Sequence, residues 1–195
     1  MRIITGLFKG AKLKTLKGDS IRPTQDRVKE SIFSILENLF KTSDFEAIKN
    51  KKVLDLFAGT GNLGMESLSR GADSIVFTDK SILSLNVLKS NIDFLKAKDK
   101  CQVIKTDSVK FLDKIKETEK FDLIFIDPPY NQGFLEIILN KVDKNAILNK
   151  NAIIVVEHSR HEKIDFNFDN LIILRQEKYG ETIVSFLILK YNEFI

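Results

Sequence analysis

The residues Asp127-Pro128-Pro129-Tyr130 combine groups that can act on a planar amine. They follow FDLIFI, in which five of six residues are apolar, as in a strand buried on both faces. A simple turn would explain the two prolines but would leave Asp127 and Tyr130 without a role. The carboxylate and the Pro128 carbonyl can each accept a hydrogen from an NH2 group, and the tyrosine ring can stack on a base.

A second motif is the glycine-rich sequence VLDLFAGTGNLG. Its glycines, Gly59, Gly61 and Gly64, form the pattern G-x-G-x-x-G between an expected strand and an expected helix. Asp79 lies twenty residues beyond Gly59, at the end of the next apolar run, where a carboxylate can hold ribose hydroxyls. The sequence therefore predicts a cofactor that contains adenosine.

Acidic residues in or after successive strand-like runs distinguish between adenosine cofactors. Asp55, Asp79, Asp107 and Asp127 would oppose the two negative charges of a pyrophosphate. They suit a cofactor with a sulfonium and an ammonium, so S-adenosylmethionine is favoured over NAD. For Asp79 and Asp107, simple capping of the following helix remains an alternative. Methyl transfer to an amine needs mainly positioning, and Asp127 or water can take the proton.

The elements that position these motifs alternate along the chain. Strands are expected at 53–57, 74–79, 101–107, 121–127 and 152–158, and helices at about 62–69, 81–96, 108–117 and 134–143. This alternation predicts an α/β, Rossmann-like fold with a mostly parallel, seven-stranded sheet and helices on both faces. Two runs within 171–190 flank a turn at Tyr179 and Gly180 and predict an antiparallel hairpin. The 127–130 motif should lie beside the glycine loop.

The first fifty residues follow a different pattern. Residues 2–16 alternate loosely around Gly6 and Gly10 and predict a small β-hairpin, and a helix is expected to begin at Pro23 or Thr24. We expect a single domain over 1–195, in which 1–20 form a basic hairpin extension, 21–50 an N-terminal helical region and 51–195 the Rossmann-like core.

Composition narrows the class of protein. With 43% hydrophobic and 30% charged residues, short apolar runs and no signal-peptide pattern, the chain is predicted to be soluble, cytoplasmic and not associated with a membrane. The one cysteine, Cys101, cannot form an intrachain disulfide, and no metal site is expected. His158 and His161 are expected to be solvated loop residues. Residues 1–30 hold eight basic and three acidic residues, a net charge of +5 against +4 for the whole chain, which suits a polyphosphate partner.

Four segments, taken in order, resemble a known family. MRIITGLFKGAKL, IRPTQDRVKESIFSIL, VLDLFAGTGNLGMESLSRGA and DLIFIDPPY are similar to the bacterial 16S ribosomal RNA guanine-N2 methyltransferases, which are class I S-adenosylmethionine-dependent enzymes. The resemblance spans nearly the whole chain, and RPT-x-DRV-x-E is its most specific part. It implies methylation of the N2 amine of guanine 966, with 16S ribosomal RNA or the assembling small subunit as partner. The protein is expected to be a monomer.

The resemblance also implies a role for particular residues. The expected catalytic residues, which would hold the guanine amine, are Asp127, Pro128, Pro129 and Tyr130. The expected cofactor-binding residues are Asp55, Phe57, Ala58, Gly59, Gly61, Asp79, Lys80, Asp107, Ser108 and Thr24. The expected RNA-binding residues are Arg2, Lys9, Lys12, Lys14, Arg22 and Arg27.

Three other functions are compatible with parts of the sequence. A DNA methyltransferase acting on adenine N6 or cytosine N4 could use the same two motifs, although the chain is short for a separate sequence-reading domain. An NAD-binding Rossmann protein would explain the glycine loop, with DPPY as a turn only. A protein-glutamine methyltransferase would more often have asparagine in place of Asp127.

Overall fold

A seven-stranded sheet forms the centre of the computed structural model, which describes residues 1–16, 26–40, 47–164 and 167–191. Its order is β3-β2-β1-β4-β5-β7-β6, and β1 to β5 run parallel while β7 is antiparallel to both neighbours. The strands are β1 (Lys52–Asp55), β2 (Ser74–Asp79), β3 (Cys101–Lys105), β4 (Phe121–Ile126), β5 (Leu148–Ser159), β6 (Leu171–Tyr179) and β7 (Thr182–Leu189). The predicted Rossmann-like sheet and its C-terminal hairpin are confirmed.

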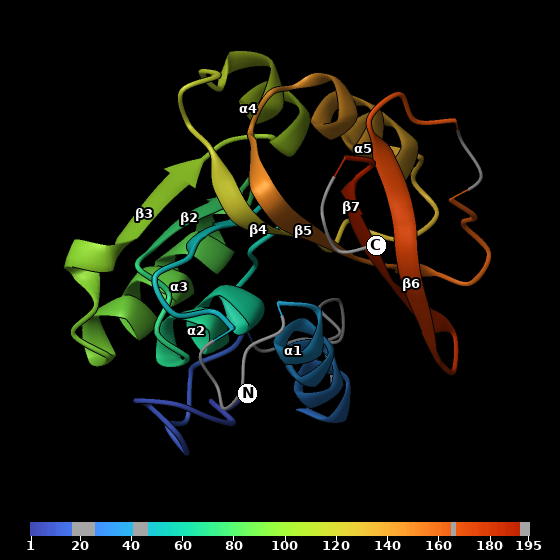
Figure 1. The fold of residues 1–195 in the computed structure, drawn as a ribbon. Helices are drawn as coiled ribbons and strands as arrows, with labels where there is room; N and C mark the ends of the chain where they lie inside the picture. The colour runs from blue at the N-terminus through green and yellow to red at the C-terminus, as the bar shows by residue number, and fades with distance from the viewer. Residues whose placement is uncertain (17–25, 41–46, 165–166, 192–195) are drawn as a thin grey trace.

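Helices cover both faces of this sheet (Figure 1). One face carries α1 (Asp26–Leu39), α2 (Asn62–Ser69) and α3 (Ile82–Phe94), and the other carries α4 (Ser108–Lys114) and α5 (Phe134–Lys144). Alternation along β4 divides the core, because Leu123 and Phe125 pack toward the first group and Ile124 and Ile126 toward the second. None of the helices in the described ranges is long and apolar enough to cross a membrane.

The expected element boundaries differ from the structure at a few ends. The third strand ends at Lys105 rather than 107, because Asp107 serves as the N-cap of α4 and accepts hydrogen bonds from the amides of Val109 and Lys110. The helix expected over 108–117 ends at Lys114. The expected helix start at Pro23 or Thr24 lies outside the described residues.

The N-terminal segment, residues 1–16, packs against the first helical face. Its expected hairpin contains one antiparallel bridge, between Arg2 and Lys12. The amides of Ile4 and Thr5 donate to the two carboxylate oxygens of Glu66, at 2.8 and 3.0 Å. Gly6 lies so close to α2 that a Cβ there would be 1.9 Å from the carbonyl oxygen of Ser69. The segment is therefore docked on α2 through its backbone.

A buried ionic network lies beneath this docking site. Lys29 on α1 is fully buried, and its Nζ donates to the Arg2 carbonyl at 2.6 Å and to Asn62 Oδ1 at 2.9 Å. The same ammonium lies 3.4 Å from Glu66 Oε2, and Arg70 bonds the other oxygen of Glu66. Because removing one partner would leave a buried charge uncompensated, the network fixes α1, α2 and the N-terminal segment relative to one another.

Candidate active site

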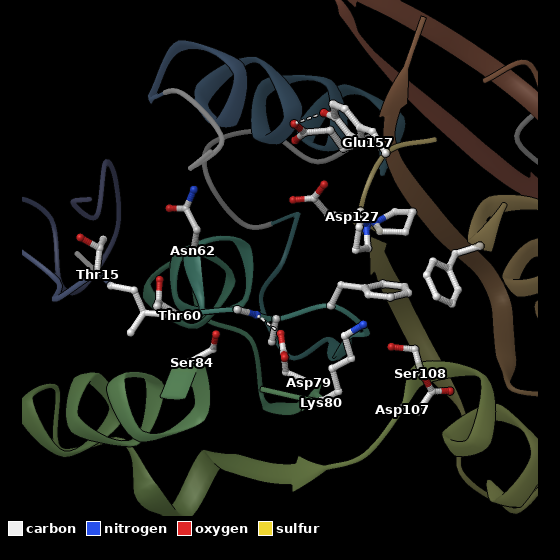
Figure 2. Close-up of a pocket in the computed structure, with 18 of the residues that line it drawn as sticks. Thr15, Thr60, Asn62, Asp79, Lys80, Ser84, Asp107, Ser108, Asp127 and Glu157 are labelled. Atoms are coloured by element: carbon white, nitrogen blue, oxygen red, sulfur yellow. Dashed lines mark hydrogen bonds between the residues drawn. The ribbon is translucent and has the colours of Figure 1, made fainter. Parts of the chain in front are cut away.

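A cavity of about 680 Å³ opens at the carboxyl ends of β1, β2 and β4. It is lined by the glycine loop on one side and by the 127–130 loop on another, and Figure 2 shows their side chains around it. The volume lies within the range typical of sites for small molecules and cofactors. The two motifs that the sequence singled out therefore share one site.

The glycine loop is held by Asp79 at the end of β2. The Gly59 amide donates to Asp79 Oδ2 at 2.8 Å, and the Ser81 amide donates to Oδ1 at 2.7 Å. Both Gly59 and Gly61 have a positive φ, of 52° and 92°. A Cβ on Gly61 would be 2.5 Å from Leu88 Cδ1, whereas a Cβ on Gly59 would meet nothing within 4 Å. Asp79 thus stabilises the glycine loop and also lines the cavity.

Two residues predicted to bind the cofactor, Asp55 and Gly61, are not among the residues that line the cavity. The Asp55 carboxylate is buried behind the loop, where Oδ2 accepts a 3.1 Å hydrogen bond from the Gly64 amide. Burial is the main cause that raises the pKa of Asp55 to about 7, and the charge of Asp79 adds to it. Asp55 can act on a ligand through its charge and through the loop.

The wall on the side of α4 and α5 is largely apolar. Phe57 and Phe134 lie with their ring centroids 6.5 Å apart, and both line the cavity together with Val109. Lys80 Nζ lies 5.8 Å from the centroid of the Phe134 ring. Ser108 donates to the Leu56 carbonyl at 2.5 Å. The other predicted cofactor residues of the described chain that line the cavity are Ala58, Gly59, Asp79 and Asp107.

The 127–130 loop brings two acidic groups and a phenol together. Asp127, Pro128, Pro129 and Tyr130 all line the cavity. Although Asp127 is only partly buried by its surface area, desolvation is the largest cause that raises its pKa well above the ordinary value. The nearby charges of Glu157 and Asp55 raise the pKa further. Because a higher pKa means a stronger conjugate base, the ionised Asp127 carboxylate accepts a proton more readily than an ordinary aspartate does.

Glu157 is a cavity residue that the sequence motifs did not assign to the site. It follows Val156, which pairs with Ile126, so β5 carries it to the edge where β4 ends. Its Oε1 accepts a 3.0 Å hydrogen bond from the Tyr130 hydroxyl. The position of an acid at the end of a strand next to β4 was the signal that could have found it. Other lining residues outside the prediction are Met1, Thr15, Leu16, Thr60, Asn62, Ser84, Val109 and Phe134.

Those predicted RNA-binding residues that the structure describes are not among the residues that line the cavity. Five of them are exposed, namely Arg2, Lys9, Lys12, Lys14 and Arg27. Arg2 forms a 2.7 Å ion pair with Asp26, and Lys14 Nζ bonds Ser90 at 2.9 Å. Arg22 and the predicted cofactor residue Thr24 lie outside the described residues.

The expectation that both histidines are solvated is wrong for His158. Strand β5 runs to Ser159, so His158 lies within the sheet and is 1% exposed. Its ring nitrogens lie 2.8 Å from Ser185 Oγ and 2.8 Å from the Glu162 carbonyl oxygen. Burial lowers the pKa of this imidazole, which is a satisfied structural group. His161 is exposed in the turn that follows, as expected.

The sheet order and the cavity at its carboxyl edge define the Rossmann-like fold of the class I methyltransferases. The model of the family described as Conserved hypothetical protein 95 matches residues 1–188. The chain belongs to this family, that of ribosomal RNA small subunit methyltransferase D.

Individual relatives cover almost the whole chain. Ribosomal RNA small subunit methyltransferase D of Haemophilus influenzae is 35% identical over 187 residues, which span 95% of this chain and 91% of the relative. The solved structure of the Escherichia coli protein yhhF has a TM-score of 0.82 at 30% identity and covers 96% of each chain. SMU.776, solved in complex with SAH, has a TM-score of 0.59 at 15% identity over 79% of this chain and 48% of its own, and that likeness concerns the fold.

Proposed function

We propose that the protein transfers a methyl group from S-adenosylmethionine to the exocyclic N2 amine of a guanine in small-subunit ribosomal RNA, at guanine 966. One observation carries the proposal: the 127–130 loop and the glycine loop line a single cavity. Membership of the small-subunit methyltransferase D family favours this chemistry over a DNA methyltransferase or an NAD-dependent enzyme. A single domain, a monomeric state and a cytoplasmic location stay predictions.

The cavity suits a cationic adenosine cofactor. Asp79 offers a carboxylate for ribose hydroxyls, and Phe57 and Val109 offer an apolar wall for a flat base. Burial is the main cause of the raised pKa values of Asp55 and Asp127, and neighbouring acidic groups raise both pKa values further. A ligand that carries positive charge relieves that repulsion, whereas a pyrophosphate would add to it. When bound, S-adenosylmethionine supplies an electrophilic methyl group on its sulfonium.

The residues of the 127–130 loop orient the amine. The Asp127 carboxylate and the Pro128 carbonyl accept its two hydrogens, which turns the nitrogen lone pair away from conjugation with the ring. Tyr130 provides the face on which the base stacks. As the nitrogen gains a bond, it becomes acidic, and Asp127 takes the proton that it releases. These steps depend mainly on placement, and the shared cavity and the raised pKa of Asp127 support the proposal.

The RNA substrate accounts for the basic N-terminal segment. Lys9, Lys12 and Arg27 are exposed, and the segment that carries the two lysines also contributes Thr15 and Leu16 to the cavity lining. Cations there can bind RNA phosphates while a single-stranded nucleotide enters the site. The names of the relatives supply the small subunit as the source of the RNA.

The test is the identity of the methylated nucleoside. Small ribosomal subunits and naked 16S RNA from a strain that lacks the enzyme are incubated with the purified protein and S-adenosylmethionine, then digested and analysed by mass spectrometry. We expect N2-methylguanosine at one position. Methylation of adenine N6 or cytosine N4, or of guanine elsewhere in the RNA, would contradict the corresponding part of the proposal.

A further inference from the structure

We propose that Glu157 reads the target base, by accepting the N1–H of guanine beside the amine that Asp127 holds. The inference rests on the proposed function and deepens it, because it names the group that would distinguish guanine from adenine and cytosine. Glu157 would therefore contact the substrate directly, in addition to its hydrogen bond with Tyr130.

The register of two neighbouring strands places the acids together. Ile126 on β4 pairs with Val156 on the parallel strand β5, so the next residues, Asp127 and Glu157, follow side by side. Ile126 and Val156 face the core on the side of α4 and α5. The two acids therefore point to the opposite side, and in Figure 2 both lie toward α1. Both line the cavity, and the charge of Glu157 acts on Asp127.

The Glu157 carboxylate is held in a fixed orientation. Tyr130 donates to its Oε1 at 3.0 Å, and the same hydroxyl lies 3.2 Å from Thr182 Oγ1 on β7. Glu157 is 8% exposed and lines the cavity, so the exposed part of its side chain faces the cavity. A carboxylate offers about four lone-pair positions, and the bond to Tyr130 uses one of them. The loop that stacks the base thus also orients the acid that would read it.

The chemistry of the base edges matches two adjacent acceptors. Guanine presents N1–H beside N2–H2, a pair of neighbouring donors. Adenine presents a lone pair at N1 beside its N6 amine, and cytosine presents one at N3 beside its N4 amine. A carboxylate that faces a lone pair is repelled and left unsatisfied, which costs about 1–3 kcal/mol when buried. Such unpaired polar groups give the strongest discrimination between similar substrates.

The test uses a base that keeps the reacting amine and loses the N1 hydrogen. RNA oligonucleotides carry guanine or 2-aminopurine at the target position, and kcat/KM for methyl transfer is measured for wild type and Glu157→Gln. We expect wild type to prefer guanine by at least about tenfold. Because a glutamine amide can donate to the N1 lone pair, Glu157→Gln should reduce this preference by about tenfold or more. Dividing the preference of wild type by that of Glu157→Gln cancels the intrinsic difference in reactivity between the amines of the two bases.

A matched control separates reading the base from positioning the tyrosine. Tyr130→Phe removes the hydroxyl that orients Glu157 and keeps the carboxylate, so its preference for guanine should fall less than that of Glu157→Gln. Equal losses on both bases in Glu157→Gln would mean that Glu157 acts only through Tyr130, and would overturn the inference. If the variant fails to fold, equal use of both bases by wild type still overturns the inference. Absence of any guanine methylation by wild type would instead defeat the proposed function.

Discussion

The hydroxyl of Tyr130 donates a 3.0 Å hydrogen bond to Glu157 Oε1 and thereby joins the loop after β4 to strand β5. The ring of Tyr130 is held at the cavity by its own hydroxyl, which also contacts Thr182 at 3.2 Å. This anchoring explains how a loop residue can present a fixed surface for a base. The pKa of the phenol is raised, through burial and the charge of Glu157, so the hydroxyl stays a donor.

Substitutions of Tyr130 separate stacking from anchoring. Tyr130→Ala removes the aromatic surface, and loss of about 1–3 kcal/mol of stacking should raise the KM for RNA roughly 5- to 150-fold. Tyr130→Phe keeps the ring and loses only the hydroxyl bonds, so its KM should rise by a few-fold. Steady-state methyl transfer to an RNA fragment measures both. Equal effects of the two variants would show that stacking contributes nothing.

The buried Asp55 makes stability depend on pH in a defined direction. Its pKa in the folded protein is about 7, against an ordinary value of 3.8, because burial disfavours the charged form. The folded state therefore holds a proton that the unfolded state releases, and this contribution to stability, complete below pH 3.8, is lost as the pH rises toward 7. Asp55→Asn cannot titrate and keeps an acceptor for the Gly64 amide.

We expect the melting temperature of Asp55→Asn, relative to wild type, to increase by several degrees between about pH 5 and pH 8. Thermal unfolding at intervals across this range measures the difference. The exposed Asp73 provides the control, because Asp73→Asn should follow wild type at every pH. A difference that does not change with pH would contradict the burial of an ionisable Asp55.

Two glycines in the N-terminal segment form a matched pair. Gly6 and Gly10 both have a positive φ, of 88° and 83°. A Cβ on Gly6 would be 1.9 Å from the Ser69 carbonyl oxygen, whereas one on Gly10 would meet nothing within 4 Å. Gly10→Ala should cost about 1–2 kcal/mol of backbone strain. Gly6→Ala should cost more and displace the segment from α2.

The cofactor site should respond to this displacement. Because Thr15 and Leu16 line the cavity, Gly6→Ala should weaken binding of S-adenosylmethionine several-fold, and Gly10→Ala should leave it close to wild type. Calorimetric binding and thermal unfolding of both variants measure the two effects. Equal behaviour of the pair would show that the segment does not support the site.

Exposed cations of the N-terminal region should control affinity for RNA and its dependence on salt. Lys9 and Lys12 are exposed in the N-terminal segment, and Arg27 is exposed on α1. Replacing each by alanine should weaken binding and reduce the slope of log K against log salt by about one unit for each phosphate that is no longer neutralised. Lys114, exposed on α4 at the opposite face, is the control and should leave the slope unchanged. An unaltered slope in the triple variant would remove this region from the RNA interface.

Much of the framework could be predicted because local pattern and topology agree. The alternation of apolar runs and amphipathic helices predicted the parallel order around β1 and β4, and short turns predicted the β6–β7 hairpin. That order alone places the 127–130 loop beside the glycine loop. The sequence pattern could not predict where the Asp55 side chain points, because its direction depends on the hydrogen bond that it accepts from the Gly64 amide behind the loop.

The residues that sequence reasoning missed depend on register and on long-range docking. Glu157 enters the site because β5 pairs with β4 at Ile126, and one residue of register would have turned it to the other face. Thr15 enters because Asn91 on α3 holds the neighbouring backbone of Lys14, 77 positions away in the sequence. His158 was expected to be solvated because it is the last residue of the strand expected at 152–158, whereas β5 runs to Ser159 and the His158 ring lies against Ser185 on β7.

The central claim is that Asp127 holds the amine that receives the methyl group. Single-turnover methyl transfer to small-subunit RNA, measured beside cofactor affinity, tests it in Asp127→Ala and Asp127→Asn. We expect the alanine variant to lose at least about a hundredfold in rate, since it removes both the acceptor and the base, and the asparagine variant, which keeps the acceptor, to lose less. An alanine variant that retains both the wild-type rate and the wild-type cofactor affinity would contradict the account.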